Sequence, residues 1–184
     1  MASLTWLPNA VHRHSPHYDD RNEQNAITLI VIHGISLPPG EFGGNFVDDL
    51  FMGRLDKNAH PTFVDIASLR VSAHFFIRRN GHLIQYVDVQ KRAWHAGVSY
   101  FKGRDRCNDF SIGIELEGTD ELAYTDNQYE TLTELIRIIQ QYYPTITQEY
   151  IVGHCNIAPE RKTDPGQAFD WKRLYADLDG HSEE

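Results

Sequence analysis

The strongest hydrophobic pattern in the chain is the continuous, β-branched run Ile27–Ile32, which ends at His33. An unbroken apolar run of this length favours a central strand that is buried on both faces. A second apolar run, Phe110–Leu116, and a short one, Tyr150–Gly153, predict two more strands. His154 follows the last of them directly, so two of the three predicted strands end at a histidine.

Two shorter runs predict a β-hairpin. Val71–Ile77 alternates loosely between apolar and polar residues, and Leu83–Val87 follows it after Asn80-Gly81. An Asn-Gly pair between two such runs is a strong signal for a two-residue turn. We therefore expect these strands to pair antiparallel.

Apolar residues at helical spacing predict one long amphipathic helix, which opens at Thr125 or Asp126 and ends before Pro144. Asn45 is expected to cap a short helix over residues 46–51. The apolar positions of the long helix are Tyr129, Leu132, Leu135, Ile136, Ile139 and Tyr142, and a final short helix is expected around Trp171, Leu174 and Tyr175.

Strands mixed with helices in this order predict an α/β or α+β fold, in which a central mixed sheet is flanked by helices. A chain of 184 residues suits one domain, residues 1–184. Residues 1–25 are polar and are expected to wrap the surface, while residues 176–184 are expected to form a flexible tail. Residues 37–44 are rich in turn formers and predict a loop, and residues 54–69 carry no clear pattern.

Composition narrows the function classes. The chain has 17 Lys and Arg against 26 Asp and Glu, which gives a formal net charge of −9. An acidic chain argues against a nucleic-acid partner, because phosphate contacts need a basic face. No apolar run approaches the roughly 20 residues of a membrane span, and the first 20 residues lack the pattern of a secretory signal. Two cysteines make no disulfide framework, so a reducing cytoplasm is the simpler expectation.

Three residues form a candidate metal site. His33 and His154 each stand just past a predicted buried strand, and Asp164 lies in a loop that can fold back on His154. Binding sites gather where the strands of helix-covered sheets end. Two imidazoles and one carboxylate are a usual ligand set for catalytic Zn²⁺, with a fourth position left open. The 121 positions between the histidines make the spacing alone a weak signal, and the alternative is that each histidine bonds a backbone group.

Glu115 is the candidate general base. Side chains alternate across a strand, so Ser111, Gly113, Glu115 and Glu117 share one face of the predicted strand 110–116. Burial there would raise the pKa of Glu115 towards the range that suits a general base. A solvated outer face is the alternative, which we favour for Glu117. Lys162 lies two residues before Asp164 and is a candidate for oxyanion stabilisation, although surface exposure is the commoner fate of a lysine.

The two cysteines are weak candidates for a nucleophile. His154 and Cys155 are neighbours in a segment expected to be extended, so their side chains should point apart. Cys107 could pair with His95 only by proximity in sequence. Both thiols are expected to be small buried residues.

Several motifs together resemble a known family. They are Val31-Ile32-His33, residues 37–44, residues 69–74, Arg92-Ala93-Trp94-His95-Ala96-Gly97, residues 112–118 and the long segment 153–166. From about residue 6 to about residue 175 the chain resembles the AmpD family of cytoplasmic 1,6-anhydro-N-acetylmuramyl-L-alanine amidases. That family belongs to the zinc amidase superfamily, which also includes phage amidases and peptidoglycan-recognition proteins.

The resemblance implies a role for each matched residue. It implies that His33, His154 and Asp164 hold Zn²⁺ in a groove at one edge of the sheet. Glu115 matches the family's acid–base carboxylate and Lys162 its oxyanion-stabilising lysine. Arg70, Trp94 and Arg106 match substrate-contact positions; without the resemblance, the tryptophan would be assigned to the core and both arginines to the surface.

The implied substrate is an anhydro-muropeptide released during recycling of the cell wall. The resemblance implies cleavage of the amide between the lactyl group of anhydro-N-acetylmuramic acid and L-alanine, by a cytoplasmic monomer that indirectly controls β-lactamase induction. One position departs from the family, which commonly has Asn after the first ligand where this chain has Gly34. We also expect the glycines of residues 37–45 to let that loop act as a lid.

Three other functions compete with this interpretation. An amidase acting on intact peptidoglycan would share the zinc chemistry but is expected to carry an export signal or a wall-binding module. A non-catalytic muropeptide-binding domain is expected to have lost a zinc ligand. A cysteine peptidase using Cys107 would respond to thiol-blocking reagents and not to chelators.

Overall fold

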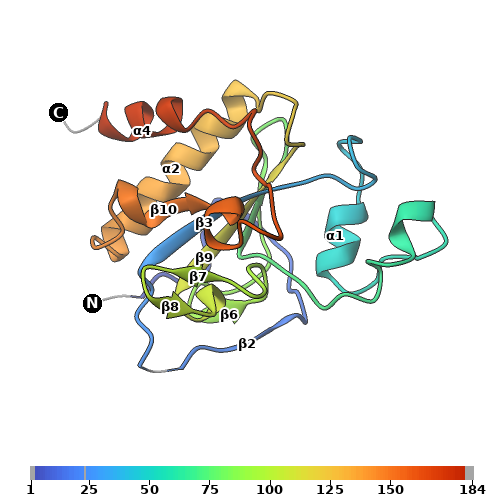
Figure 1. Cartoon of the computed structure of the whole chain (residues 1–184), viewed down its shortest axis with the longest axis horizontal. Helices are drawn as coiled ribbons and strands as arrows, with labels where there is room; N and C mark the ends of the chain where they lie inside the picture. The colour runs from blue at the N-terminus through green and yellow to red at the C-terminus, as the bar shows by residue number, and fades with distance from the viewer. Residues whose placement is uncertain (1–2, 23, 181–184) are drawn as a thin grey trace.

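The computed structural model describes residues 3–22 and 24–180 and is built around a six-stranded sheet. Figure 1 shows the long helix and the C-terminal helix together on one side of this sheet, with a separate short helix standing away from them. The strands lie in the order β1–β5–β4–β9–β3–β10. Their bounds are β1 Val11–His12, β5 Leu83–Gln85, β4 Phe75–Ile77, β9 Ser111–Glu117, β3 Leu29–Ile35 and β10 Ile151–Gly153.

The sheet is mixed, as the sequence predicted. β3 pairs in parallel with β9 on one side and with β10 on the other, and β4 pairs in parallel with β9. β1 pairs in parallel with β5, so among the described strands of this sheet only β4 and β5 pair antiparallel. The predicted hairpin is therefore confirmed, but its turn is longer than two residues. The Arg78 amide donates to the His82 carbonyl and Gly81 takes φ +83°, which is the pattern of a three-residue loop with a glycine bulge.

β4 begins later than the predicted run Val71–Ile77. The Gly113 amide, on the neighbouring strand β9, donates to Nδ1 of the His74 ring at 3.1 Å. Because that amide bonds a side chain and not a backbone carbonyl, the regular ladder between the two strands starts only at Phe75.

One face of the sheet packs on helix α2, Asp126–Tyr142, which in turn contacts α4, Trp171–Asp179. Thr125 caps α2 as predicted: its hydroxyl accepts from the Gln128 amide, and the Gln128 side chain accepts from the Thr125 amide. Side chains that alternate along the central strands fill this core, with Ile30, Ile32, Ile112, Ile114 and Leu116 facing Leu132, Leu135, Ile136 and Ile139.

The opposite face of the sheet is covered by short elements and loops. A small cluster around Leu29, Val31 and Cys107 lies there, so the central strands are buried on both faces, as the apolar run predicted. The covering elements are β2 Tyr18–Asp20, β6 Lys91–Ala93, β7 Tyr100–Phe101, β8 Arg104–Asp105, α3 His154–Ile157 and the 3-10 turns η2 Cys107–Asp109 and η3 Gln148–Tyr150.

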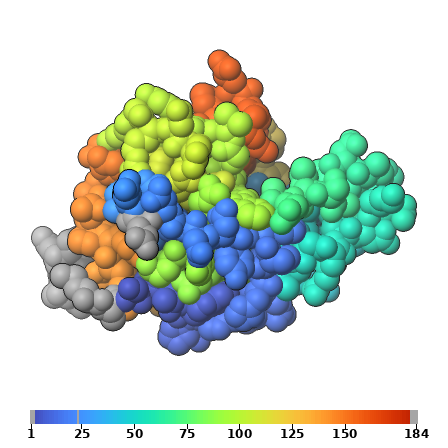
Figure 2. All heavy atoms as spheres, turned by 90° about the horizontal axis from the view of Figure 1, so that it is seen from below, coloured from blue at the N-terminus to red at the C-terminus, as the bar shows by residue number. Residues whose placement is uncertain are grey.

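A lobe formed by α1, Phe46–Phe51, and the 3-10 turn η1, Pro61–Phe63, stands out from one side of the sheet. Figure 2 shows this lobe in cyan to green, beyond the rest of the molecule. Asn45 occupies the N-cap position of α1, as predicted. Its side chain makes no capping hydrogen bond, so the prediction that Asn45 caps the helix with its side chain is wrong. Asp48, on α1, accepts from the Tyr86 hydroxyl at 3.0 Å and thereby fastens the lobe to the sheet.

The two terminal segments contribute more than the sequence suggested. Within residues 3–22, Leu4 and Leu7 enter the core, β1 joins the edge of the sheet, and β2 pairs with β6. The final helix continues to Asp179, so residues 176–179 of the expected flexible tail are helical; residues 181–184 lie outside the described part of the chain. None of the helices in the described residues has the length and apolar character needed to cross a membrane.

Candidate metal centre

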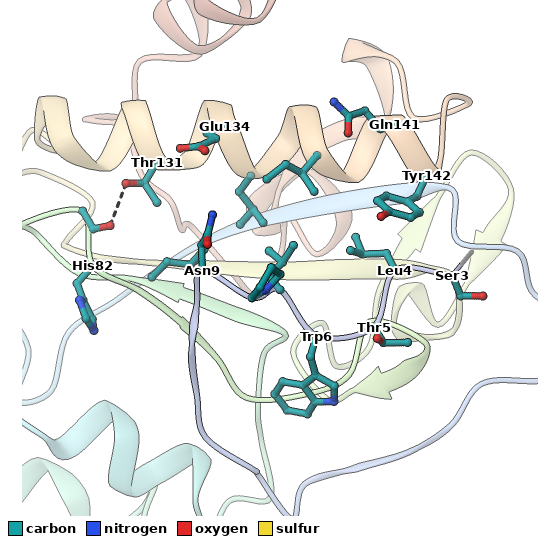
Figure 3. A pocket seen from close by; sticks show the side chains of 16 residues that line it. Ser3, Leu4, Thr5, Trp6, Asn9, His82, Thr131, Glu134, Gln141 and Tyr142 are labelled. Atoms are coloured by element: carbon teal, nitrogen blue, oxygen red, sulfur yellow. Dashed lines mark hydrogen bonds between the residues drawn. The ribbon is translucent and has the colours of Figure 1, made fainter. Parts of the chain in front are cut away.

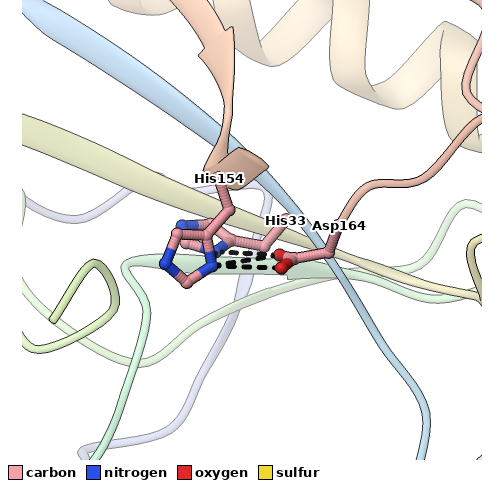
Figure 4. Close-up of side chains that lie close together, drawn as sticks. All are labelled: His33, His154 and Asp164. Atoms are coloured by element: carbon pink, nitrogen blue, oxygen red, sulfur yellow. Dashed lines mark hydrogen bonds and ion pairs between the residues drawn. The ribbon is translucent and has the colours of Figure 1, made fainter. Parts of the chain in front are cut away.

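His33, His154 and Asp164 converge, although they come from three separate segments (Figure 4). His33 lies on β3 and points to the face opposite α2, because it follows Leu29 and Val31 in the strand alternation. His154 begins α3 directly after β10, which pairs with β3. The Asp164 loop folds back as expected, since the Cys155 amide donates to the Asp164 carbonyl at 3.0 Å.

The spacing of the three side chains suits a tetrahedral cation. Nδ1 of His33 lies 3.0 Å from Nδ1 of His154 and 3.3 Å from Oδ2 of Asp164, and Nδ1 of His154 lies 3.2 Å from that carboxylate. A tetrahedral Zn²⁺ with bonds of 2.0–2.1 Å separates its ligand atoms by about 3.3 Å. The distances therefore match one ion shared by three ligands, with a fourth position left for another group.

The electrostatics of the site also favour a cation. Burial lowers the pKa of His33 to about 4, so its ring is neutral. Burial alone would raise the pKa of the Asp164 carboxyl, but hydrogen bonds with His154 and His33 hold that pKa well below its usual range. A neutral imidazole and an ionised carboxylate are the protonation states that metal ligation requires.

Glu115 lies beside this group on β9. Its side chain is buried, and Oε1 is 3.8 Å from Nδ1 of His33. Burial, together with the nearby charge of Asp164, raises the pKa of Glu115 well above its usual value. Among the described residues, Oε2 of Glu115 has no hydrogen-bond partner, which leaves one buried carboxylate oxygen free to bond a bound molecule.

These residues line one cavity of about 250 Å³ together with Lys162. Lys162 is half-buried and its backbone amide bonds the Ala158 carbonyl. The far wall of the cavity is mostly apolar and reaches the lobe. It includes Leu37, Leu50, Phe51, Ile66, Leu69, Val71 and Trp94.

The three predicted substrate-contact residues lie at different distances from this cavity. Trp94 lines the cavity, and its indole N–H donates to Asp19 at 3.1 Å. The Arg70 guanidinium lies 5.3 Å from the centre of the Trp94 ring. Arg106 does not line the cavity; its side chain is 74% exposed and pairs with Asp109 at 2.9 Å.

Glu117 is buried, with 3% of its surface exposed, so the solvated outer face that we favoured for it is wrong. Its two oxygens accept from the Gly43 amide at 2.6 Å and from the Arg79 amide at 3.0 Å. Arg78 also donates to the Gly44 carbonyl at 2.8 Å. Glu117 therefore ties the loop of residues 37–44 to the sheet. The strand alternation, which places Glu117 with Glu115 on a covered face, is the signal that pointed to this burial.

Gly34 makes room for a tyrosine. A Cβ at position 34 would lie 2.3 Å from the Tyr124 hydroxyl, which donates to the Pro165 carbonyl at 2.8 Å. Tyr124 thus ties the segment next to Asp164 to the sheet, in space that a side chain at position 34 would occupy.

Neither cysteine is placed as a nucleophile. Cys107 is buried and burial raises the pKa of its thiol. Both ring nitrogens of His95, the histidine near Cys107 in the sequence, bond other residues, namely His33 and Ser111. Cys155 lies in α3 and is half-buried, so the extended segment and full burial expected for it are wrong.

A larger cavity of about 570 Å³ lies elsewhere, between the N-terminal segment and α2 (Figure 3). Glu134, on α2, and His82 are two of the titratable residues that line it. The candidate metal ligands lie in the smaller cavity, which is therefore the better candidate for chemistry.

Comparison with known proteins points to one family. The family model described as N-acetylmuramoyl-L-alanine amidase matches residues 23–167. The 1,6-anhydro-N-acetylmuramyl-L-alanine amidase AmpD of Escherichia coli (strain K12) is 61% identical over 169 residues, covering 92% of this chain and 92% of that protein. AmpD of Haemophilus influenzae is 58% identical over 164 residues, covering 89% of each protein.

Solved structures agree. The crystal structure of a selenomethionine derivative of AmpD matches with a TM-score of 0.93 at 58% identity, covering 97% of this chain and 99% of that one. The complex of E. coli AmiD with the substrate anhydro-N-acetylmuramic acid-L-Ala-D-γ-Glu-L-Lys matches with a TM-score of 0.61 at 29% identity, covering 85% of this chain and 60% of that one. These matches confirm the predicted single domain with a mixed sheet flanked by helices.

Proposed function

Because this chain belongs to the N-acetylmuramoyl-L-alanine amidase family, we propose that it hydrolyses anhydro-muropeptides during peptidoglycan recycling. The bond that breaks is the amide between the lactyl carbonyl of 1,6-anhydro-N-acetylmuramic acid and the nitrogen of L-alanine. Water supplies the new oxygen, so the products are the lactyl carboxylate and a peptide with a free amine. The names of relatives that are about 60% identical over nearly the whole chain support this substrate.

His33, His154 and Asp164 would hold Zn²⁺, since their donor atoms and spacing fit that ion. When bound in such a site, zinc supplies Lewis-acid chemistry: it lowers the pKa of water to about 7 and polarises a carbonyl. The protein's part is to keep three ligands on one side and to leave the cavity side open for substrate and water.

Glu115 would take the proton of the attacking water and later deliver it to the leaving nitrogen. Its raised pKa suits both steps, because a carboxyl of higher pKa is a stronger base and can still give the proton back. The partnerless Oε2 is the oxygen that is free to receive that proton.

Lys162, on the wall of the same cavity, would place positive charge beside the oxyanion that forms at the lactyl carbonyl. Removal of one such donor typically costs about 2.7–4 kcal/mol of barrier. Trp94, with Arg70 over its ring, would offer an apolar surface to the sugar. Arg106 lies away from the cavity lining, so it would reach only a peptide stem that extends past the cavity mouth.

The convergence of both histidines and Asp164 beside the buried carboxylate of Glu115 is the observation that carries this proposal. The test is incubation of the purified chain with an anhydro-muropeptide, followed by mass spectrometry of the products. The proposal expects anhydro-N-acetylmuramic acid and the intact peptide. Binding without cleavage would support the non-catalytic domain, and faster cleavage of intact peptidoglycan would support the wall-directed amidase.

We also propose that the protein is cytoplasmic, that it is a monomer and that it indirectly controls β-lactamase induction. These three properties rest on the resemblance to the AmpD family. Cell fractionation and measurement of the mass in solution test the first two. Deletion of the gene, with β-lactamase measured before and after complementation, tests the third.

A further inference from the structure

The two candidate histidine ligands turn their outer nitrogens to consecutive residues. Both rings point Nδ1 at the carboxylate of Asp164, so each Nε2 points into the protein. Nε2 of His33 lies 2.9 Å from Nδ1 of His95, and Nε2 of His154 lies 3.0 Å from the Ala96 carbonyl oxygen. The segment His95–Ala96 therefore receives the outer side of both rings.

The direction of these hydrogen bonds follows from the lone pairs. A ring that gives the lone pair of Nδ1 to a cation carries its proton on Nε2. The His33 ring then donates to Nδ1 of His95, which must be unprotonated. His95 carries its own proton on Nε2 and donates it to the Ser111 hydroxyl at 3.1 Å. The hydrogen bonds from the His33 ring to Ser111 therefore all point in one direction, away from the metal position.

The sheet is shaped to hold the His95 ring. A Cβ at Gly113 would lie 2.4 Å from that ring, so only glycine on β9 admits the imidazole at this depth. Of the His95 surface, 9% is exposed. The Asn108 side-chain oxygen accepts from the backbone amides of His95 and Ala96 at 3.1 and 2.8 Å, which fixes the segment from behind.

We propose that His95 is a positioning residue that fixes the tautomer and ring orientation of His33 for metal binding. This inference rests on the proposed function, because it needs His33 to be a ligand. Outer partners of metal-bound histidines commonly raise metal affinity 10- to 100-fold, and most are carboxylates, backbone carbonyls or water. Here the outer partner is a neutral imidazole, which accepts only in one of its two tautomers.

The test compares the zinc affinity of His95→Leu and His95→Asn with that of the unchanged protein, by competition with a chromophoric chelator. Leu removes the acceptor at the Nδ1 position, whereas the Asn oxygen can replace it. We expect a 10- to 100-fold loss of affinity in His95→Leu and recovery to within a few-fold in His95→Asn. Equal affinities in all three proteins would overturn the proposal.

His74→Leu is the matched control. This second buried imidazole packs near the His95 ring, with ring centres 6.0 Å apart, and contacts no candidate ligand. Its loss should leave zinc affinity unchanged. An equal loss of affinity in His74→Leu and His95→Leu would show a general packing effect and would also overturn the proposal.

A spectroscopic measurement on the unchanged, zinc-loaded protein covers the case in which the variants fail to fold. Long-range ¹H–¹⁵N correlations report which ring nitrogen carries the proton. We expect Nε2–H on His95; a proton on its Nδ1 would contradict the proposal. Failure of the unchanged protein to bind zinc would instead count against the proposed function, so the two failures are distinguishable.

Discussion

His33 and Glu115 lie directly opposite one another on the adjacent parallel strands β3 and β9, with Nδ1 and Oε1 3.8 Å apart. A candidate metal ligand and a candidate general base are thus fixed by the register of the two longest strands of the sheet. A shift of one residue would turn one of the two side chains to the α2 face. The pairing therefore makes their separation a property of the fold and not of a loop.

Substitution of Glu115 should separate catalysis from metal binding. We expect Glu115→Gln to retain zinc with little change, because the three ligands come from other segments. Turnover of the anhydro-muropeptide should fall about 10²- to 10⁴-fold, the usual loss when a general acid–base is removed. Steady-state kinetics and metal analysis of the same sample check this, and full turnover would remove Glu115 from the mechanism.

The close approach of Gly34 and Tyr124 predicts an energetic coupling. We expect Gly34→Ala to lower the free energy of unfolding by about 1–3 kcal/mol, because its Cβ would overlap the Tyr124 hydroxyl. In a Tyr124→Phe background most of that cost should disappear, since the nearest remaining ring atom, Cζ, is 3.6 Å away. Urea unfolding of the four proteins measures the coupling.

Gly44→Ala is the control for this cycle, because a Cβ there meets only Phe46, at 3.9 Å. It should change stability by a few tenths of a kcal/mol in either background. Equal costs of Gly34→Ala with and without the tyrosine hydroxyl would refute the steric explanation.

The buried carboxylate of Glu117 predicts that the loop of residues 37–44 is held in place. Glu117→Gln keeps one acceptor oxygen and loses the other, which should weaken the bonds to the Gly43 and Arg79 amides by about 1–3 kcal/mol. Hydrogen exchange at Gly43 should then become roughly 5- to 150-fold faster. Glu41→Gln, on the exposed side of the same loop, should leave that exchange unchanged. Unaltered exchange in Glu117→Gln would show that the carboxylate does not hold the loop.

His74 should make stability depend on pH. Burial, with the nearby charge of Arg21, lowers the pKa of His74 to about 3, below the value near 6.5 of the unfolded chain. Between these values the unfolded state binds one more proton than the folded state, so stability present above pH 6.5 is lost as the pH falls. The expected contribution is about 1.4 kcal/mol per pH unit.

Urea unfolding of the metal-free protein between pH 6 and pH 4 tests this. His74→Asn should show the smaller dependence on pH, because the titrating ring is gone. A dependence identical to that of the unchanged protein would mean that His74 does not titrate on unfolding in this range.

The sequence predicted the parts of the fold that depend on local pattern. The apolar runs predicted β3, β9 and β10 to within three residues at each end, because strands buried on both faces are continuously apolar. The helix α2 followed from its periodicity and from Thr125. The sequence spacing of His33, His154 and Asp164 was only a weak indication that they converge. The resemblance to the AmpD family was the stronger reason to expect a metal site.

The remaining features depend on contacts between distant segments. The late start of β4 comes from the His74 ring bonding a backbone amide of β9. The roles of His95 and Tyr124 depend on which glycine faces them across the sheet, Gly113 for the first and Gly34 for the second. A single sequence shows these residues but not their partners, so local patterns could not reveal them.

We propose that one cation held by His33, His154 and Asp164 is required for cleavage of the lactyl–alanine amide. The most direct test of this proposal is titration of the chelator-treated protein with zinc, while cleavage of the anhydro-muropeptide is followed. We expect no cleavage without metal, a linear rise in cleavage rate with added zinc and a plateau at one zinc per chain. Full cleavage by a protein that retains less than about a tenth of an equivalent of metal would contradict it.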